Sequence, residues 1–169
     1  MQSEHHDPAE HSPSFVTRAT AGALGGLAGA AIKLVCEAIV PPRTADREAP
    51  PGILAANIVR AVSGRELSLE RKKRVALAMH WSFSVTTSVL YSVLIARAPR
   101  ATPAKGVGFG VAVWAGFHEF FLPSVGATPP LRELPLGEQL NELVSHAIFG
   151  STVDYVRGTV VGYAARRNA

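Results

Sequence analysis

Four long apolar stretches, separated by polar connections, constrain the fold of this chain more than any other feature. They span residues 15–40, 72–98, 105–122 and 137–163. Each is apolar almost all round a helix rather than along one stripe, and a soluble bundle could not keep such surfaces in water. No stretch alternates as a strand does, and no repeat of fixed period occurs. The sequence therefore predicts an all-α integral membrane bundle of four antiparallel transmembrane helices.

Length and charge fit a single membrane domain. The chain has 169 residues and a net charge of +4, with Lys and Arg gathered at the edges of the apolar stretches and in the first connection. That distribution is typical of membrane flanks, and it lacks the basic stripe that a nucleic-acid partner would need. Residues 1–14 are polar and carry no positive leader. We predict a disordered tail at 1–14 and a four-helix transmembrane domain at 15–165, with the lipid bilayer as its main partner.

The first apolar stretch, residues 15–40, is long enough to cross a hydrocarbon core of ~30 Å at ~1.5 Å per residue. Gly22 with Gly26, and Gly25 with Gly29, form two small-xxx-small pairs that let another backbone come close. We expect these glycines at a close helix–helix contact, within the chain or between copies in a homo-oligomer.

The first connection, residues 41–74, holds one amphipathic segment. Apolar residues recur along one side of it, at Ile53, Leu54, Ile58, Val59 and Val62. This spacing predicts a short interfacial helix, or a surface helix that caps the bundle.

The second stretch carries polar groups on one helical face: His80, Ser84, Thr87, Ser88 and Tyr91. Such a stripe either lines a wet path or forms a packing surface whose hydroxyls bond to backbone carbonyls. Both interpretations stay open at the level of the sequence.

Ionisable residues stand near one end of every apolar stretch. Because the directions of antiparallel helices alternate, these ends lie on the same side of the membrane, mostly within about two helical turns (~11 Å) of the interface. Glu138, Glu142 and His146 share one face of the fourth helix. At the opposite end we expect Asp154 and Arg157, three residues apart, to pair. The sequence predicts one polar cluster formed by Lys33, Glu37, His80, His118, Glu119, Glu142 and His146.

Three chemistries fit such a cluster. Imidazoles beside buried carboxylates could respond to protons. His80, His118, His146 and Glu142 could bind a metal or haem. The same groups could instead form a structural network that fixes the register of the bundle. The sequence has no Ser-His-Asp or Cys-His arrangement, no phosphate loop and no CxxC, so it predicts no enzyme and no cofactor.

A set of motifs in fixed order points to a known family. The set comprises Lys33-x-x-x-Glu37 with Pro41-Pro42-Arg43, His80-Trp81, His118 leading to Pro123, Gly126, Thr128, Pro129 and Pro130, and Glu142-x-x-x-His146-x-x-x-Gly150. In these motifs the chain resembles the YagU-like family of small bacterial inner-membrane proteins, over roughly residues 20–160. The resemblance implies a multi-pass protein of the inner membrane and a role in acid resistance with no established molecular activity. It favours the proton-responsive interpretation over the metal site.

Two arguments about orientation point in opposite directions. The side that carries the cluster has nine Lys and Arg residues, against six near the helix ends on the other side. The positive-inside rule therefore favours a cytoplasmic cluster. A role in acid response favours a cluster that faces the periplasm.

Overall fold

The computed structural model describes residues 13–43, 47–95 and 102–167, and all regular structure within these ranges is helical. The long elements are α1 (Phe15–Ile39), α3 (Leu69–Leu94) and α6 (Leu136–Arg167). The all-α class is confirmed. The predicted tail at 1–14 lies almost wholly outside the described residues.

The shorter elements occupy the first connection and the third apolar stretch. They are α2 (Pro50–Ser63), α4 (Pro103–Val113), the π-helix η2 (Trp114–Phe121), α5 (Leu122–Ser124) and the 3₁₀ turn η3 (Leu131–Glu133). The third stretch was expected to be one α-helix. Instead it begins as α4, widens into η2 and closes as α5.

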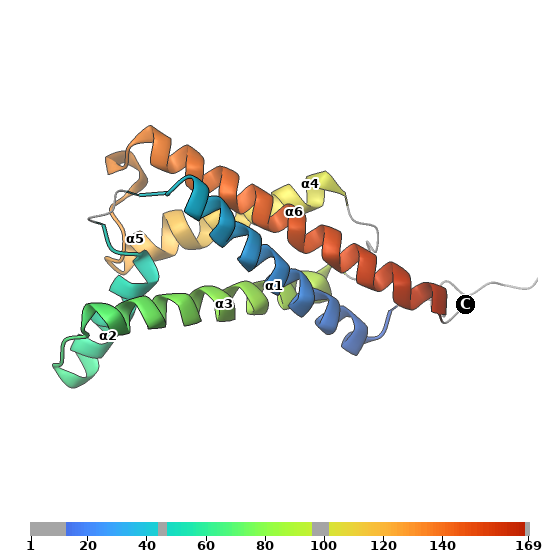
Figure 1. The fold of residues 1–169 in the computed structure, drawn as a ribbon, viewed down its shortest axis with the longest axis horizontal. Coiled ribbons are helices and arrows are strands. Elements are labelled where there is room, and N and C mark those ends of the chain that lie inside the picture. Colours follow the sequence, from blue (N-terminus) through green and yellow to red (C-terminus); the bar gives the residue numbers. More distant parts are fainter. Residues whose placement is uncertain (1–12, 44–46, 96–101, 168–169) are drawn as a thin grey trace, which may run out of the picture.

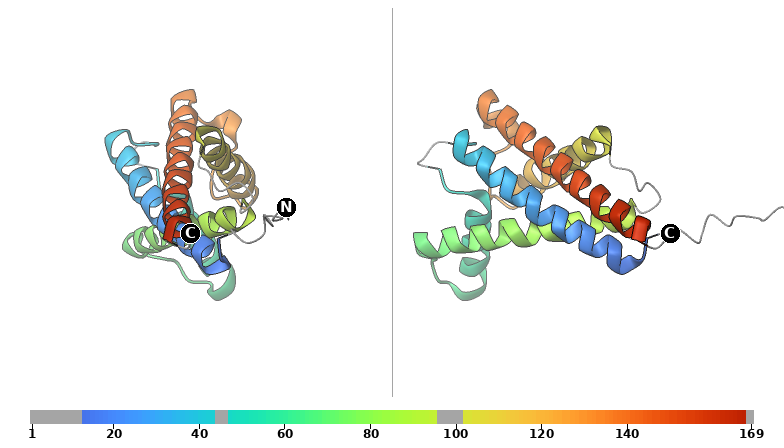
Figure 2. Two further views of the ribbon diagram at one scale, coloured as in Figure 1. Left: turned by 90° about the vertical axis from the view of Figure 1, so that its right-hand side faces the viewer. Right: turned by 45° about the vertical axis from the view of Figure 1, so that its right-hand side comes forward.

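The four main helical segments alternate in direction along the long axis of the molecule (Figure 1). α1 packs against both α3 and α6, and α4 packs against α6, as further views of the ribbon also show (Figure 2). The end of α1, the start of α3, the segment η2 and the start of α6 therefore meet at one end of the molecule (Figure 1). This is the arrangement that brings the predicted cluster together.

α2 covers that end of the molecule. It begins with Pro50 and Pro51, at helical positions where the missing N–H groups are not needed, and ends at Gly64 with a φ of 66°. Its Leu54 is buried in a small core with Leu122 and Ala127. The short helix predicted in the first connection is confirmed, and it packs against α3.

The glycines of α1 lie at two close helix contacts, as predicted. Gly22 and Gly26 face α3, whereas Gly25 and Gly29 face α6. A Cβ atom on Gly26 would lie 2.8 Å from the backbone oxygen of Ser84. Both faces are thus used within the chain, and a homo-oligomer would have to form through other surfaces.

The serines of α3 supply the other half of the contact with α1. Ser84, Ser88 and Ser92 are all buried. The hydroxyl of Thr87, on the same helix, donates to the carbonyl oxygen of Phe83 at 2.8 Å. Because Ser84 and Ser88 pack against the α1 glycines, this part of the hydroxyl stripe is a packing surface.

Replacing Gly26 with leucine should therefore destabilise the fold. The new side chain would meet the backbone of α3, and overpacking of this kind costs about 1–3 kcal/mol. Thermal unfolding in detergent measures the change. Leu27→Ala is the control, because Leu27 is 45% exposed and a change at such a site costs about 0.5 kcal/mol or less. An unchanged midpoint for Gly26→Leu would contradict the contact.

A second set of glycines, not predicted from the sequence, joins α4 to α6. Gly106 and Gly110 of α4 face the backbone of α6 near Gly150. A Cβ atom on Gly110 would overlap the carbonyl oxygen of His146 and lie 2.7 Å from its carbonyl carbon. The contact brings α4 against the helical turn that carries His146.

Asp154 and Arg157 form the predicted pair away from the cluster, and both are 1% exposed. Asp154 accepts from Arg157 Nε, from the Tyr91 hydroxyl and from the Thr102 backbone N–H, each at 2.9 Å. These bonds fasten α3 and the start of α4 to α6. Because the Asp154 carboxylate accepts from all three donors, its burial is tolerated here.

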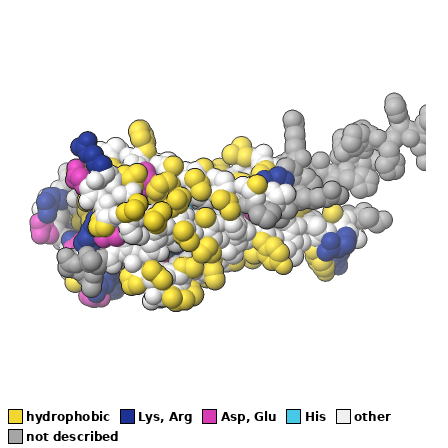
Figure 3. Space-filling view, turned by 90° about the horizontal axis from the view of Figure 1, so that it is seen from above, with side chains coloured by type: hydrophobic (Ala, Val, Ile, Leu, Met, Phe, Trp, Pro, Cys, Tyr) yellow, Lys and Arg dark blue, Asp and Glu magenta, His cyan; other side chains and the backbone are white. Residues whose placement is uncertain are grey.

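Apolar side chains cover the middle of the molecule, while Lys, Arg, Asp and Glu gather mainly at the end capped by α2 (Figure 3). Among the described residues, α1 is the one helix that is both long and apolar enough to cross a membrane. The hydroxyls of α3 and the Asp154–Arg157 pair of α6 make those helices more polar, and η2 interrupts the third stretch. One candidate span is therefore found, and the four predicted spans stay a prediction.

Candidate functional site: a buried Glu/His/Lys/Arg cluster

A π-helical turn presents the histidine of the third stretch. In η2 the backbone widens, and the N–H of Leu122 reaches back to the carbonyl oxygen of Phe117. Such turns are rare and often mark functional sites, because the extra residue redirects side chains. Phe117 stacks on Phe83 of α3, with ring centroids 4.2 Å apart. This packing holds η2 in place and leaves His118 directed at α6.

Glu142 is the centre of the cluster and is only 6% exposed. One carboxylate oxygen lies 2.9 Å from Arg43 Nη2, and the other lies 3.3 Å from Lys33 Nζ. Lys33 also pairs with Glu37 one turn away on α1. Lys33 and Glu142, two of the residues predicted to cluster, are thus in contact. Two cations thus hold this buried carboxylate, as a charge out of water requires.

Two histidines flank the same carboxylate. His118 Nε2 lies 3.6 Å from the oxygen that Arg43 contacts, and His146 Nδ1 lies 3.6 Å from the other oxygen. The two imidazole rings meet edge to face, with centroids 5.5 Å apart. One carboxylate therefore has four basic side chains around it, and two of them are neutral unless protonated.

The hydrogen bond of His146 fixes its tautomer. His146 Nδ1 lies 2.7 Å from the backbone carbonyl oxygen of Glu142, which can only accept. Nδ1 therefore carries the hydrogen, and in the neutral ring Nε2 carries the lone pair. An added proton would go to Nε2.

The structure also places the remaining predicted residues. Glu119 lies 3.9 Å from His118 Nδ1 at the edge of the cluster. His80 stands apart, because its Nε2 donates to the carbonyl oxygen of Ala30 at 3.2 Å, and no polar contact with Glu142 is found within the described ranges. Six of the seven predicted residues are joined by polar contacts, and His80 is the exception.

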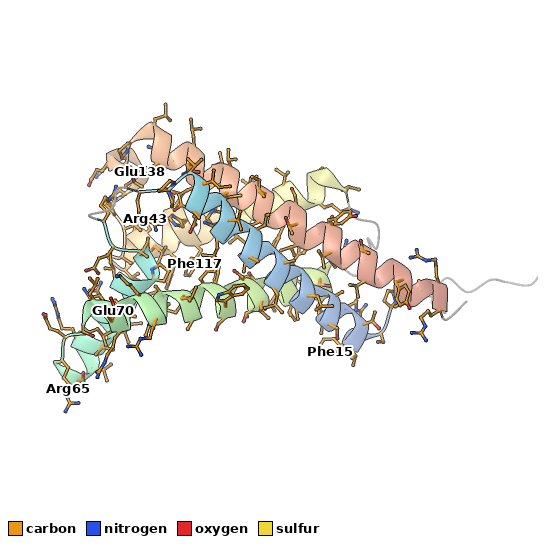
Figure 4. All side chains as sticks on the ribbon, in the orientation of Figure 1. Phe15, Arg43, Arg65, Glu70, Phe117 and Glu138 are labelled. Atoms are coloured by element: carbon orange, nitrogen blue, oxygen red, sulfur yellow. The ribbon has the colours of Figure 1, made fainter. Side chains whose placement is uncertain are left out.

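Sequence reasoning missed one member of the cluster, Arg43. The signal was its position directly after Pro41-Pro42, where the chain leaves α1 and must turn across the end of the bundle. Glu138, on the same face of α6 as Glu142, pairs instead with Arg47 at 2.7 Å. Both arginines tie the first connection to the start of α6, at the end where Figure 4 labels Arg43 and Glu138.

The cluster lies between two cavities of about 250 Å³ each. The cavity that we call inner is lined by His80, His146, Lys33 and Glu37 together with apolar side chains. The outer cavity is lined by groups such as Glu48 and Glu119 and by apolar residues such as Ile53 and Leu134. The side chains that line both are Arg43, Pro50, His118 and Glu142. These shared residues form the wall between the cavities.

The geometry does not assemble the metal site considered above. Among the residues that the structure describes, no group of three or more His, Cys, Asp and Glu side chains could hold a metal ion. The oxygens of Glu142 face Lys33 and Arg43, and His80 is held by the backbone of α1.

Comparison with known proteins identifies the family. The family model described as "Protein of unknown function (DUF1440)" matches residues 27–155. The chain belongs to this family. It is also 28% identical, over 78 residues, to a protein of Escherichia coli (strain K12) named "Inner membrane protein YagU". The predicted YagU-like family is therefore confirmed.

The match to that relative is partial. It covers 46% of this chain and 38% of the relative's length. The DUF1440 match includes every residue of the cluster. No solved structure matches the chain.

Proposed function

We propose that this DUF1440 protein is a multi-pass protein of the bacterial inner membrane that responds to protons through its His/Glu cluster and contributes to acid resistance. The observation that carries the proposal is the pair of imidazoles, His118 and His146, beside one buried carboxylate in the wall between two cavities. The name of the E. coli relative supports the inner membrane as the location.

The position of the polar residues supports four spans. Five polar residues within α3 and α6 are buried inside the protein: Ser84, Ser88, Ser92, Asp154 and Arg157. The exposed polar residues in the same stretches include the hydroxyl residues Ser82, Thr86 and Thr159. Large apolar side chains such as Leu90, Val144 and Tyr155 are exposed on the same helices. A membrane helix that belongs to a bundle hides polar groups in this way. α1, α3, the segment α4–α5 and α6 are the proposed spans.

With neutral histidines, the two cations Lys33 and Arg43 balance Glu37 and Glu142. Glu119 at the edge of the cluster adds a third carboxylate. The charged or titratable groups that face His118 and His146 are Lys33, Glu37, Arg43, His80, Glu119 and Glu142. Each proton added to an imidazole therefore brings a positive charge close to two fixed cations.

Acidification then changes the competition for Glu142. A protonated His118 competes with Arg43 for one carboxylate oxygen, which the two groups approach at 3.6 and 2.9 Å. A protonated His146 competes with Lys33 for the other oxygen, at 3.6 and 3.3 Å, and the proposed response needs both histidines. Arg43 lies in the wall between the cavities, and loss of its contact with Glu142 would remove one of the two arginine contacts between the first connection and α6. Arg47 and Glu138 form the other. The proposed response to acid is an opening of this wall.

A second candidate is a non-catalytic scaffold in which the cluster only fixes the bundle. The complete pairing of Glu142 by Lys33 and Arg43 favours it. The two cavities beside the cluster favour the proton response, because a purely structural network needs no space around it.

Replacing His146 with phenylalanine separates the two candidates. The proton response predicts that cells carrying His146→Phe survive acid no better than cells without the protein, while the variant accumulates normally. The scaffold predicts reduced abundance at every pH. Tyr155→Phe is the control, since Tyr155 lies on the same helix and is 70% exposed. Normal abundance with full acid protection would contradict both candidates.

A further inference from the structure

The inner cavity has one polar end and apolar walls. Two cations, two carboxylates and three histidines make up its ionisable lining: Lys33, Arg43, Glu37, Glu142, His80, His118 and His146. Leu77, Phe83, Phe117 and Phe149 line the rest, and they come from α3, η2 and α6. Phe117 is labelled in Figure 4, in the region between α1 and α3. A ligand that fits this cavity has a small polar head and an apolar body.

Two histidines of this cavity offer acceptor nitrogens. His146 Nδ1 and His80 Nε2 each donate to a backbone carbonyl oxygen, so in the neutral rings His146 Nε2 and His80 Nδ1 carry lone pairs. Within the described residues no group donates to either nitrogen. The head of the ligand therefore needs a hydrogen to donate.

The fixed charges restrict the head further. Lys33 and Arg43 line the cavity together with Glu37 and Glu142 and are paired with them, so these charges balance and a head that enters uncharged is favoured. A carboxyl group meets both demands, because its O–H donates to an imidazole and its carbonyl oxygen accepts from a cation.

We infer that the inner cavity binds an undissociated monocarboxylic acid with one apolar chain. The inference rests on the proposed function, because it names a weak carboxylic acid as the source of the proton to which the cluster responds. The acid O–H bond breaks and its proton passes to the lone pair of an imidazole nitrogen. The products are an imidazolium ion and a carboxylate, and the carboxylate is held by Lys33 or Arg43. A weak acid that enters from the membrane thereby charges the cluster directly.

The size of the cavity sets the length of the chain. Its volume of about 250 Å³ lies below the range of about 300–1,000 Å³ for pockets that take drug-sized ligands. A single short chain fits, whereas a phospholipid with two long chains does not. Octanoic acid is the probe that we choose.

Binding can be measured by NMR of octanoic acid labelled with ¹³C at its carboxyl carbon, added to the full chain in lipid nanodiscs. We expect a saturable bound signal, after subtraction of empty nanodiscs. Ala76→Phe, which fills the cavity, should weaken binding at least tenfold. Ala78→Phe, two residues away and exposed, should leave it unchanged. His146→Phe should also weaken binding tenfold, because the ring loses its acceptor nitrogen.

Competition tests the chemical class. 1-Octanol and octylamine should each displace the acid at least tenfold less well than unlabelled octanoic acid does. Equal displacement by octanol would overturn the inference and leave only an apolar cavity. Displacement of the acid in nanodiscs of anionic lipid, but not of zwitterionic lipid, would assign the site to a lipid headgroup and overturn it as well.

The inference and the proposed function can fail separately. If no saturable binding is found but His146→Phe abolishes acid protection, the proposed ligand is refuted and the proton response is supported. If His146→Phe binds the acid tenfold more weakly but still gives full acid protection, binding in the cavity is supported and the proton response is refuted.

Discussion

Replacing Glu142 with glutamine is expected to abolish acid protection while the protein still accumulates. The substitution removes the one carboxylate for which Arg43, His118 and His146 compete, so protonation of the histidines no longer changes what holds the first connection. Survival of cells after acid challenge, together with the amount of protein in the membrane, measures the effect. Survival should fall to that of cells without the protein.

The cost of Glu142→Gln in stability should be moderate. A hydrogen bond to a charged group contributes about 1.5–3 kcal/mol, whereas a buried charge left alone costs about 3–5 kcal/mol. Lys33 keeps Glu37 as a partner, and Arg43 lines the outer cavity as well. The lower range therefore applies. Glu70→Gln is the control, because the Glu70 side chain is 70% exposed and pairs only with Lys73 in the described structure. Unchanged survival of the Glu142 variant would contradict the account.

Replacing Gly110 with alanine should destabilise the protein by about 3 kcal/mol or more, at the upper end of the range for overpacking. The new methyl group would meet the backbone of His146, which cannot move aside as a flexible side chain could. α4 and α6 must separate, and the turn that carries His146 must shift with them. Thermal unfolding in detergent measures the first effect, and acid survival measures the second.

Gly108→Ala is the matched control for Gly110→Ala. Gly108 lies on the same helix and a Cβ atom there would have no neighbour within 4 Å. Both changes remove the same backbone freedom, which by itself makes alanine more favourable than glycine in a helix by about 1 kcal/mol. The control should therefore be as stable as the natural protein or more so. Equal behaviour of the two variants would show that α4 and α6 are not in close contact at Gly110.

The sequence was sufficient to predict the meeting of the cluster. Alternating helix directions bring Lys33, His118, Glu142 and His146 to one end of the bundle, and that argument needs only the apolar pattern and the chain order. The small-xxx-small spacing likewise predicted the faces of α1 that contact other helices. Both predictions depend on regular helical geometry.

Features that depend on departures from regular geometry were not predicted. Nothing in the residues 114–121 indicates a π-helix, which arises where tertiary packing favours an extra residue in the turn. Arg43 lies in a connection, where spacing gives no direction for a side chain. His80 shares the cavity but bonds to Ala30, because a nearby backbone carbonyl offered a partner that helix positions alone do not reveal.

The most direct test of the account is the exposure of the inner cavity as a function of pH. The natural cysteine Cys36 is replaced by serine, and a cysteine is placed at Met79, which lines the inner cavity. Its rate of reaction with a water-soluble pyridyl disulfide is divided by that of a cysteine at Val62, which is 83% exposed on α2. The ratio removes the part of the pH effect on thiol chemistry that both cysteines share. We expect the ratio to rise at least fivefold from neutral to acid pH, and to stay constant when both His118 and His146 are phenylalanine. A ratio that does not change with pH when both histidines are present would contradict the proposed opening.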